Sequence, residues 1–129
     1  MKNKFGKLTT PYGVRLEKHE QMTIDCFLAR GKNVEAIKPS NTRKQKSPDV
    51  IIDGVVWEIK SPISSSRRKI EQRIREANKQ SENIIFDLRR VDKYPDKVEK
   101  EVLKQYDRVP RIRRLIIIKK SGKMIDYSK

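Results

Sequence analysis

Two carboxylates and a lysine lie within a short stretch of the chain, and their spacing suggests chemistry. Asp49 precedes a short apolar run, and Glu58 and Lys60 end a second one. Two carboxylates can supply oxygen ligands to a divalent cation, and a neighbouring ammonium group can orient water or neutralise developing negative charge. Metal-assisted hydrolysis of a phosphodiester needs this combination of groups. The three residues are therefore our candidate catalytic set.

The two apolar runs predict a β-hairpin that positions these residues. Residues 50–52 and 55–57 are rich in β-branched side chains and flank Asp53-Gly54. An Asp-Gly pair between apolar runs is typical of a two-residue type I′ turn, which fixes the register of the hairpin. The predicted cross-strand pairs are Ile52 with Val55, Ile51 with Val56, Val50 with Trp57, and Asp49 with Glu58.

Side-chain alternation along these strands predicts one apolar face and one chemical face. The apolar face, which we expect to join the core, carries Val50, Ile52, Val55, Trp57 and Ile59. The opposite face carries Asp49, Ile51, Val56, Glu58 and Lys60. Because opposed like charges repel, the two carboxylates need compensation, either from Lys60 or from a bound metal ion.

A helix predicted over residues 16–30 supplies a further candidate. Gly31 follows the last periodic residue, as expected for a helix C-terminus. Glu20 falls within the apolar stripe of this helix, at i+4 from Leu16 and i−4 from Ile24. A single Glu in such a stripe commonly reaches outward from its edge, so a structural and a functional interpretation of Glu20 both stay open.

The remaining pattern predicts an α/β fold with a mixed central sheet flanked by helices. Residues 1–13 form a basic, poorly specified leader, and residues 14–129 form one domain. The continuous apolar runs in residues 83–88 and 115–118 are typical of central strands covered on both faces. The other predicted elements are a strand at residues 33–37, a helix from residue 67 to about residue 80, a helix at residues 96–106, and a strand at residues 124–127 antiparallel to residues 114–119.

The charge balance favours a polyanionic partner. The 129 residues include 32 Lys and Arg against 17 Asp and Glu, a formal net charge of +15, which suits nucleic acid. A basic protein of membrane surfaces is the rival, but no amphipathic helix with a Trp, Phe and Leu face accompanies the charge. The candidate nucleic-acid contacts are Arg43, Lys44 and Lys46 in a loop before the hairpin, and Arg67, Arg68, Arg73 and Lys79 in the helix after it. A solvated run of charge is the alternative interpretation of these groups.

The candidate catalytic residues also carry a family resemblance. The chain reads Pro48-Asp49, then eight residues, then Glu58-Ile59-Lys60, and this pattern resembles the PD-(D/E)xK nuclease superfamily. The resemblance implies that Asp49 and Glu58 hold Mg²⁺ and that Lys60 is catalytic. It also implies an acidic residue from the first helix, which favours Glu20 over Glu17.

A narrower resemblance covers nearly the whole chain. It is similar to the C-terminal tRNase toxin domains of contact-dependent growth inhibition proteins of the CdiA type. The residues that carry this likeness are Glu20, Gly31, Pro48-Asp49, Trp57-Glu58-Ile59-Lys60-Ser61-Pro62, and Ala77 with Gln80 before the strand at residues 83–88. Ser61 and Gln80 become secondary site candidates, together with Glu17. Such toxins are usually the tail of a very long secreted protein.

This resemblance implies a metal-dependent endoribonuclease toxin that cleaves tRNA. It would act in the bacterial cytoplasm after delivery, and an acidic immunity protein would bind its basic surface. Two alternatives remain open: a DNA endonuclease of restriction or resolvase type on the same fold, and a basic nucleic-acid-binding module without catalysis. In the second alternative, Asp49→Asn and Glu58→Gln would not weaken nucleic-acid binding.

Overall fold

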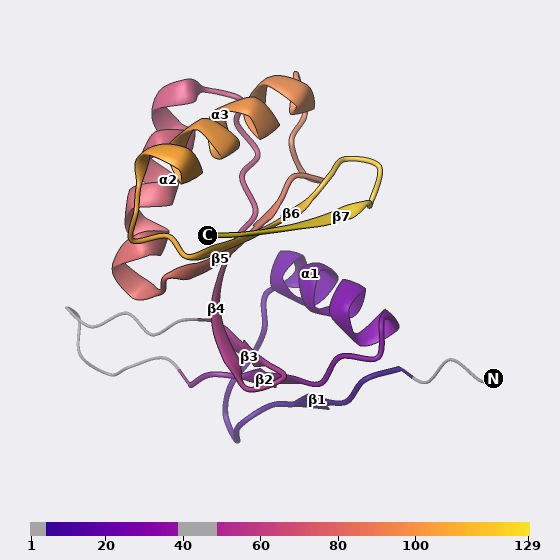
Figure 1. Ribbon diagram of the computed structural model, residues 1–129. Coiled ribbons are helices and arrows are strands. Elements are labelled where there is room, and N and C mark those ends of the chain that lie inside the picture. Colours follow the sequence, from indigo (N-terminus) through magenta and orange to yellow (C-terminus); the bar gives the residue numbers. More distant parts are fainter. Residues whose placement is uncertain (1–4, 39–48) are drawn as a thin grey trace. The chain divides into compact units, whose positions relative to one another are not determined.

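The computed structural model describes residues 5–38 and 49–129, and in these residues it shows three helices and seven strands (Figure 1). The elements, in chain order, are β1 (Leu8–Thr9), α1 (Lys18–Ala29), β2 (Val34–Ala36), β3 (Val50–Ile52), β4 (Val55–Lys60), α2 (Arg67–Gln80), β5 (Asn83–Asp87), α3 (Pro95–Arg108), β6 (Arg114–Ile118) and β7 (Met124–Ser128). Backbone pairing gives the strand order β1-β2-β3-β4-β5-β6-β7 with parallel and antiparallel neighbours. The predicted mixed α/β fold is confirmed.

The chain divides into an amino-terminal unit, residues 1–57, and a carboxy-terminal unit, residues 58–129. The boundary falls inside β4. The first part of β4 pairs antiparallel with β3, and its last three residues pair parallel with β5. Each unit therefore depends on one part of the same strand.

In the amino-terminal unit the predicted hairpin is confirmed. Asp53 and Gly54 have φ values of 47° and 82°, so both occupy the left-handed region that a type I′ turn requires. The pairs of β3 with β4 are Ile52 with Val55, Ile51 with Val56, and Val50 with Trp57. A two-residue turn leaves no freedom of register, which explains why local sequence was sufficient here.

The predicted apolar face of this hairpin is also confirmed in the amino-terminal unit. Val50, Ile52 and Trp57 are buried, whereas Val56 on the other face is 36% exposed. Helix α1 packs against β2 and adds the buried side chains of Ile24 and Phe27 to this small core. The unit thus has one covered and one open sheet face.

Two features at the start of the chain differ from expectation. Helix α1 begins at Lys18 rather than at residue 16, although it ends as expected, with Gly31 at φ 78°. Strand β1 lies within the predicted leader and pairs parallel with β2 through bonds such as that from the Val34 amide to the Lys7 carbonyl, 2.9 Å. A strand of two residues carries no periodicity, so only its distant partner identifies it.

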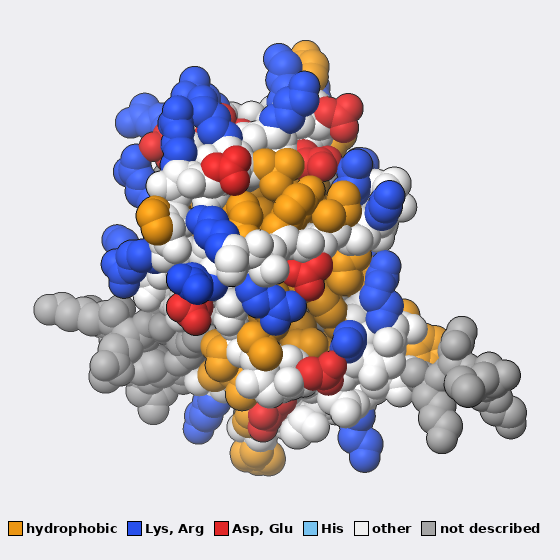
Figure 2. Space-filling view, viewed as in Figure 1, with side chains coloured by type: hydrophobic (Ala, Val, Ile, Leu, Met, Phe, Trp, Pro, Cys, Tyr) orange, Lys and Arg blue, Asp and Glu red, His pale blue; other side chains and the backbone are white. Residues whose placement is uncertain are grey.

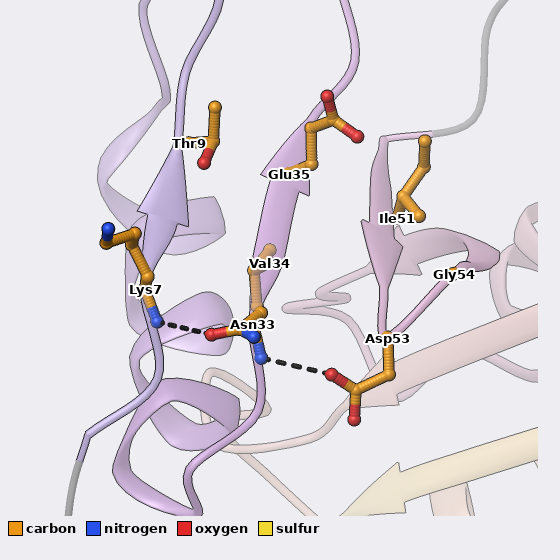
Figure 3. A pocket seen from close by; sticks show the side chains of 8 residues that line it. All are labelled: Lys7, Thr9, Asn33, Val34, Glu35, Ile51, Asp53 and Gly54. Atoms are coloured by element: carbon orange, nitrogen blue, oxygen red, sulfur yellow. Dashed lines mark hydrogen bonds between the residues drawn. The ribbon is translucent and has the colours of Figure 1, made fainter.

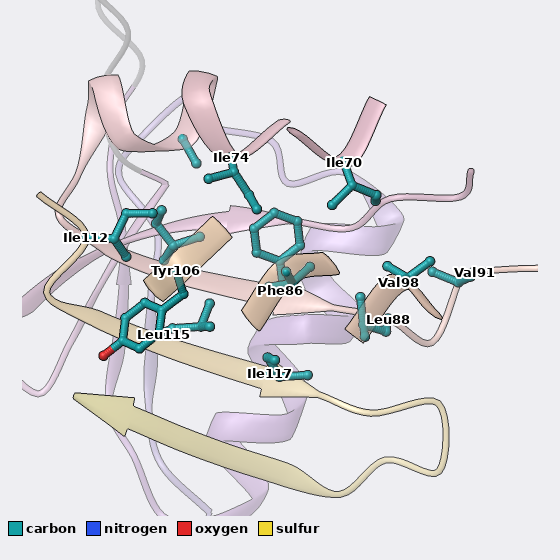
Figure 4. Packing of buried hydrophobic residues seen from close by; sticks show 13 residues of the cluster. Ile70, Ile74, Phe86, Leu88, Val91, Val98, Tyr106, Ile112, Leu115 and Ile117 are labelled. Carbon is teal, nitrogen blue, oxygen red and sulfur yellow. The ribbon is translucent and has the colours of Figure 1, made fainter. Parts of the chain in front are cut away.

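In the carboxy-terminal unit, helices α2 and α3 pack together over one face of β5 and β6 (Figure 4). Ile84, Ile85 and Phe86 are fully buried, which confirms β5 as a central strand covered on both faces. The core cluster consists of Ile70, Ile74, Ala77, Ile84, Phe86, Leu88, Val91, Val98, Val102, Tyr106, Ile112, Leu115 and Ile117.

Both helices of this unit follow their apolar stripes. Helix α2 buries Ile70, Ile74 and Ala77 and ends at Gln80, as predicted. Helix α3 extends one residue before and two residues beyond its predicted range, with Pro95 in its first turn, where a missing amide hydrogen has no cost. Strand β7 pairs antiparallel with β6, also as predicted.

We expect Ile84→Ala to lower the free energy of unfolding by about 2–5 kcal/mol, because Ile84 is 0% exposed at the centre of this cluster. Ile63→Ala removes the same atoms from a side chain that is 55% exposed, so it should cost no more than about 0.5 kcal/mol. Urea denaturation followed by circular dichroism measures both values. Equal losses in the two variants would contradict the core described here.

Candidate active site and basic surface

Glu58 and Lys60 form an ion pair on β4 in which Glu58 is buried and Lys60 is half-buried. Lys60 Nζ lies 3.3 Å from Oε2 of Glu58, and the two side chains are 17% and 3% exposed. In the parallel register with β5, Glu58 lies beside Ile84 and Lys60 beside Phe86. Parallel partners share a sheet face, so both charged side chains project on the face that α2 and α3 cover.

This location is costly for charged groups. Removing an ion from water costs several kcal/mol even after the protein relaxes, and a hydrophobic pair of similar volume would stabilise a fold as well or better. Stability alone therefore does not explain why Glu58 and Lys60 occupy β4. A fixed carboxylate beside a fixed ammonium group is instead suited to hold a cation or a reacting anion.

Asp49 is held by backbone hydrogen bonds to both neighbouring strands. Its amide donates to the Trp57 carbonyl and its carbonyl accepts from the Ile37 amide, both at 3.1 Å. Because Val50 already pairs with Trp57, two residues stand opposite one, which is the arrangement of a β-bulge. Bulges re-aim side chains and are frequent beside active sites.

This bulge affects one prediction from the sequence. The ladder of β3 with β4 ends at the pair of Val50 with Trp57, so the predicted rung of Asp49 with Glu58 is not part of it. Simple alternation also no longer fixes the direction of the Asp49 side chain. The meeting of the two carboxylates therefore stays a prediction.

Glu20 and Glu17 form a capping box at the start of α1. Glu20 Oε1 accepts a hydrogen bond from the Glu17 amide at 2.9 Å, and the Glu17 side chain in turn caps the first turn. Glu17 also lies 3.4 Å from His19. The sequence left open an outward-reaching Glu20 and a functional Glu20, and this cap was not predicted from it. The pattern that indicates the capping box is the spacing of the two Glu residues, at N-cap and N3.

The secondary candidates Ser61 and Gln80 lie in the carboxy-terminal unit. Arg90 Nη1 donates to the Ser61 carbonyl at 3.2 Å, while the buried Ser61 Oγ has no hydrogen-bond partner in the described part of the chain. An unsatisfied buried hydroxyl costs about 1–3 kcal/mol, so Ser61 is poorly explained by structure alone. Gln80 ends α2 and lines an open pocket of about 480 Å³.

The predicted nucleic-acid contacts on α2 divide into paired and unpaired cations. Arg67 lies 3.4 Å from Glu101, and Arg73 lies 3.6 Å from Glu76. Arg68 and Lys79 are exposed, and no described carboxylate lies within 4.0 Å of either. Figure 2 shows Lys and Arg side chains gathered over α2 and α3 with a few acidic ones between them. The remaining predicted contacts, Arg43, Lys44 and Lys46, lie outside the described residues.

The donor atoms of the predicted metal ligands fit Mg²⁺. Asp49 and Glu58 offer carboxylate oxygens, and Mg²⁺ is commonly held by one or two carboxylates together with water and substrate phosphate. Among residues 5–38 and 49–129, no three acidic, His or Cys side chains gather closely enough to form a complete protein cage.

A second open pocket, of about 650 Å³, lies on the amino-terminal unit (Figure 3). Its walls come from β1, β2, β3 and the hairpin turn, and include Lys7, Glu35 and Asp53. Asn33 links these segments by two hydrogen bonds. Its side-chain oxygen accepts from the Lys7 backbone amide at 2.9 Å, and its backbone amide donates to the Asp53 carboxylate at 3.2 Å. None of the predicted catalytic residues lines this pocket.

Comparison with known structures supports the fold. The chain is similar to a solved structure described as "CdiA-CT/CdiI toxin and immunity complex from Burkholderia pseudomallei", with a TM-score of 0.68 and 20% sequence identity. The match covers 96% of this chain and 100% of that chain. No curated protein matches the sequence.

The family follows from the sequence itself. A family model described as "Contact-dependent growth inhibition CdiA C-terminal domain" matches residues 46–124, more than half of the chain. The chain therefore belongs to the family of CdiA C-terminal domains of contact-dependent growth inhibition and is a toxin domain. No helix in the described ranges is long and apolar enough to cross a membrane.

Sequence reasoning missed two cations that the fold places beside predicted ones. Arg111 and Arg113 line the same pocket as Lys79 and Gln80. Residues 108–114 are visibly basic in the sequence, but their proximity to the end of α2 depends on the register of β5 with β6. That register is set by residues far apart in the chain, so the local sequence pattern does not predict it.

Substitutions at Glu20 can separate its capping role from a catalytic one. Glu20→Ala should lower the free energy of unfolding by about 1 kcal/mol, because it removes one arm of the capping box. Glu20→Gln should keep most of that stability, because Gln also accepts the bond from the Glu17 amide. Thermal denaturation measures both, and equal destabilisation by the two variants would contradict the capping role.

Proposed function

We propose that this toxin domain is a metal-dependent endoribonuclease of the PD-(D/E)xK type that hydrolyses phosphodiester bonds of tRNA. The observation that carries the proposal is the ion pair of the buried Glu58 with the half-buried Lys60, 3.3 Å apart on β4. Asp49 lies in a bulge whose amide bonds to Trp57, the residue directly before Glu58. A nuclease motif and an ion pair with a buried carboxylate thus fall on the same residues.

Each residue has a distinct role in this proposal. Asp49 and Glu58 would hold Mg²⁺, with Glu20 as a further ligand through water. When bound, the ion would polarise the phosphate and lower the pKa of a bound water. Lys60 would orient the attacking water or neutralise charge on the phosphorane. Its ammonium group is already positioned by Glu58, so little reorganisation is needed at the moment of reaction.

The substrate assignment rests on charge and on family membership. A net charge of +15 supplies affinity for phosphate without reading sequence. Cations on α2 and in residues 108–114 come from separate segments, an arrangement that suits a folded RNA recognised by shape and backbone. A tRNA meets this description better than a palindromic DNA site, and the toxin would meet tRNA in the cytoplasm of a bacterial target cell.

We also propose an acidic immunity protein as the partner of this domain. The similar Burkholderia structure is described as a toxin and immunity complex, and a producing cell needs protection from its own nuclease. Complementary charge would accelerate association and make the on-rate sensitive to salt. Carboxylates of such a partner could replace substrate phosphate at the basic surface.

Asp49→Ala and Lys60→Ala should each lower RNA cleavage at least about 100-fold, because each removes a group that acts in the transition state. Affinity for RNA should change little, since most binding comes from the basic surface. Lys93→Ala, at an exposed lysine outside the proposed site, is the control and should cleave normally. EDTA should also abolish cleavage.

Circular dichroism should first show that the variants fold. Cleavage that survives in Asp49→Ala would overturn the proposed site. If EDTA has no effect while Asp49→Ala is inactive, the carboxylates act on protons directly and the metal assignment is wrong.

Incubation with total RNA and plasmid DNA, with and without Mg²⁺, identifies the substrate. We expect discrete tRNA fragments on a denaturing gel and intact plasmid, because folded RNA suits the dispersed positive charge. Nicked plasmid with intact tRNA would instead select the DNA endonuclease. Binding without cleavage of either nucleic acid would select the non-catalytic module.

A further inference from the structure

The pocket at the end of α2 has the composition of an anion site. Its volume is about 480 Å³, and it is lined by Asn78, Lys79, Gln80, Ser81, Glu82, Pro110, Arg111 and Arg113. Three of these side chains are cations and one is a carboxylate, and the side-chain amides of Asn78 and Gln80 add hydrogen-bonding groups. All of these residues belong to the carboxy-terminal unit.

The three cations differ from Arg75 and Arg114 nearby because none of them forms an ion pair with a described carboxylate. On α2, Arg75 lies 2.6 Å from Glu71, and on β6 Arg114 lies 3.0 Å from Asp126. In contrast, Lys79, Arg111 and Arg113 are exposed, and no described carboxylate lies within 4.0 Å of their charged groups. Their positive charge is therefore available to an external anion.

The backbone at Arg113 is held by several hydrogen bonds. The Arg113 and Arg114 amides both donate to the Glu82 carbonyl, at 2.8 and 3.3 Å. The Lys129 amide and the Tyr106 hydroxyl donate to the Arg113 carbonyl, at 3.1 and 3.4 Å. A fixed backbone at Arg113 lowers the entropic cost of placing its side chain against a ligand.

We propose that this pocket binds a backbone phosphate of the RNA substrate. The inference rests on the proposed function and adds Arg111 and Arg113 to the residues that contact RNA. Arginine and lysine are the usual phosphate ligands in protein complexes with nucleic acid, and such contacts fix the register of the substrate rather than its sequence. The pocket would hold the tRNA body while the β4 residues act on the scissile bond.

The test compares two double variants with equal changes in charge. Lys79→Gln with Arg111→Gln alters the pocket, whereas Lys100→Gln with Arg15→Gln removes one lysine and one arginine from exposed positions elsewhere. The probe is a fluorescein-labelled tRNA transcript, and its fluorescence anisotropy in EDTA measures the affinity of each variant. The salt concentration is varied from about 0.05 to about 0.3 M, where phosphate contacts dominate the salt dependence of binding. A gel confirms that the probe stays intact.

We expect the pocket variant to bind about tenfold more weakly and to lose about one unit of slope in log K against log salt for each phosphate contact removed. At the upper end of the salt range the control should change affinity less than about twofold, because salt screens exposed charges that do not contact the RNA. An unchanged slope in the pocket variant, or equal loss in the control, would overturn the inference. Loss of affinity for the immunity protein with unchanged tRNA binding would also overturn it.

Failure of the inference and failure of the proposed function give different results. If the unaltered domain cleaves tRNA but the pocket variant keeps its salt slope, only the pocket is wrong. If the unaltered domain cleaves no RNA, the proposed function fails, and with it the inference that depends on it.

Discussion

Strand β4 is the constraint on which the rest of the structure depends. Its residues Val55 to Trp57 complete the antiparallel hairpin, and its residues Glu58 to Lys60 complete a parallel ladder with β5. A shift of one residue would turn Trp57 out of one core and the charged pair into the other face. The same register that buries the apolar side chains thus fixes where Glu58 and Lys60 lie.

Local sequence predicted much of this arrangement because local physics determines it. The Asp53-Gly54 turn sets the hairpin register, and apolar runs such as Ile84 to Phe86 identify covered strands. Strand β1 and the bulge at Asp49 were not predictable in the same way. Strand β1 depends on the hydrogen bond between Lys7 and Val34, and the bulge on the bond between Asp49 and Trp57. No periodicity in the sequence predicts either bond.

The candidate site was less predictable than the fold for a related reason. Residue types identified Glu58 and Lys60, but only the parallel register with β5 shows that they lie on a helix-covered face. Likewise, Glu20 was singled out because a carboxylate occupied an apolar stripe, yet its described contact is with the Glu17 amide. A single residue can serve both a cap and a site, and composition cannot separate the two roles.

The distribution of unpaired charge follows from this physics. Several cations of α2 are neutralised by carboxylates one helical turn away or on α3, so the raw count of Lys and Arg overstates the electrostatic attraction of that helix. Lys79, Arg111 and Arg113 escape this neutralisation: they line a pocket where a helix end meets the start of a strand, and the one described carboxylate that lines it, that of Glu82, forms no ion pair with them. A polyanion would therefore be attracted most strongly by cations that the fold leaves without partners, and these need not be the ones most densely clustered in the sequence.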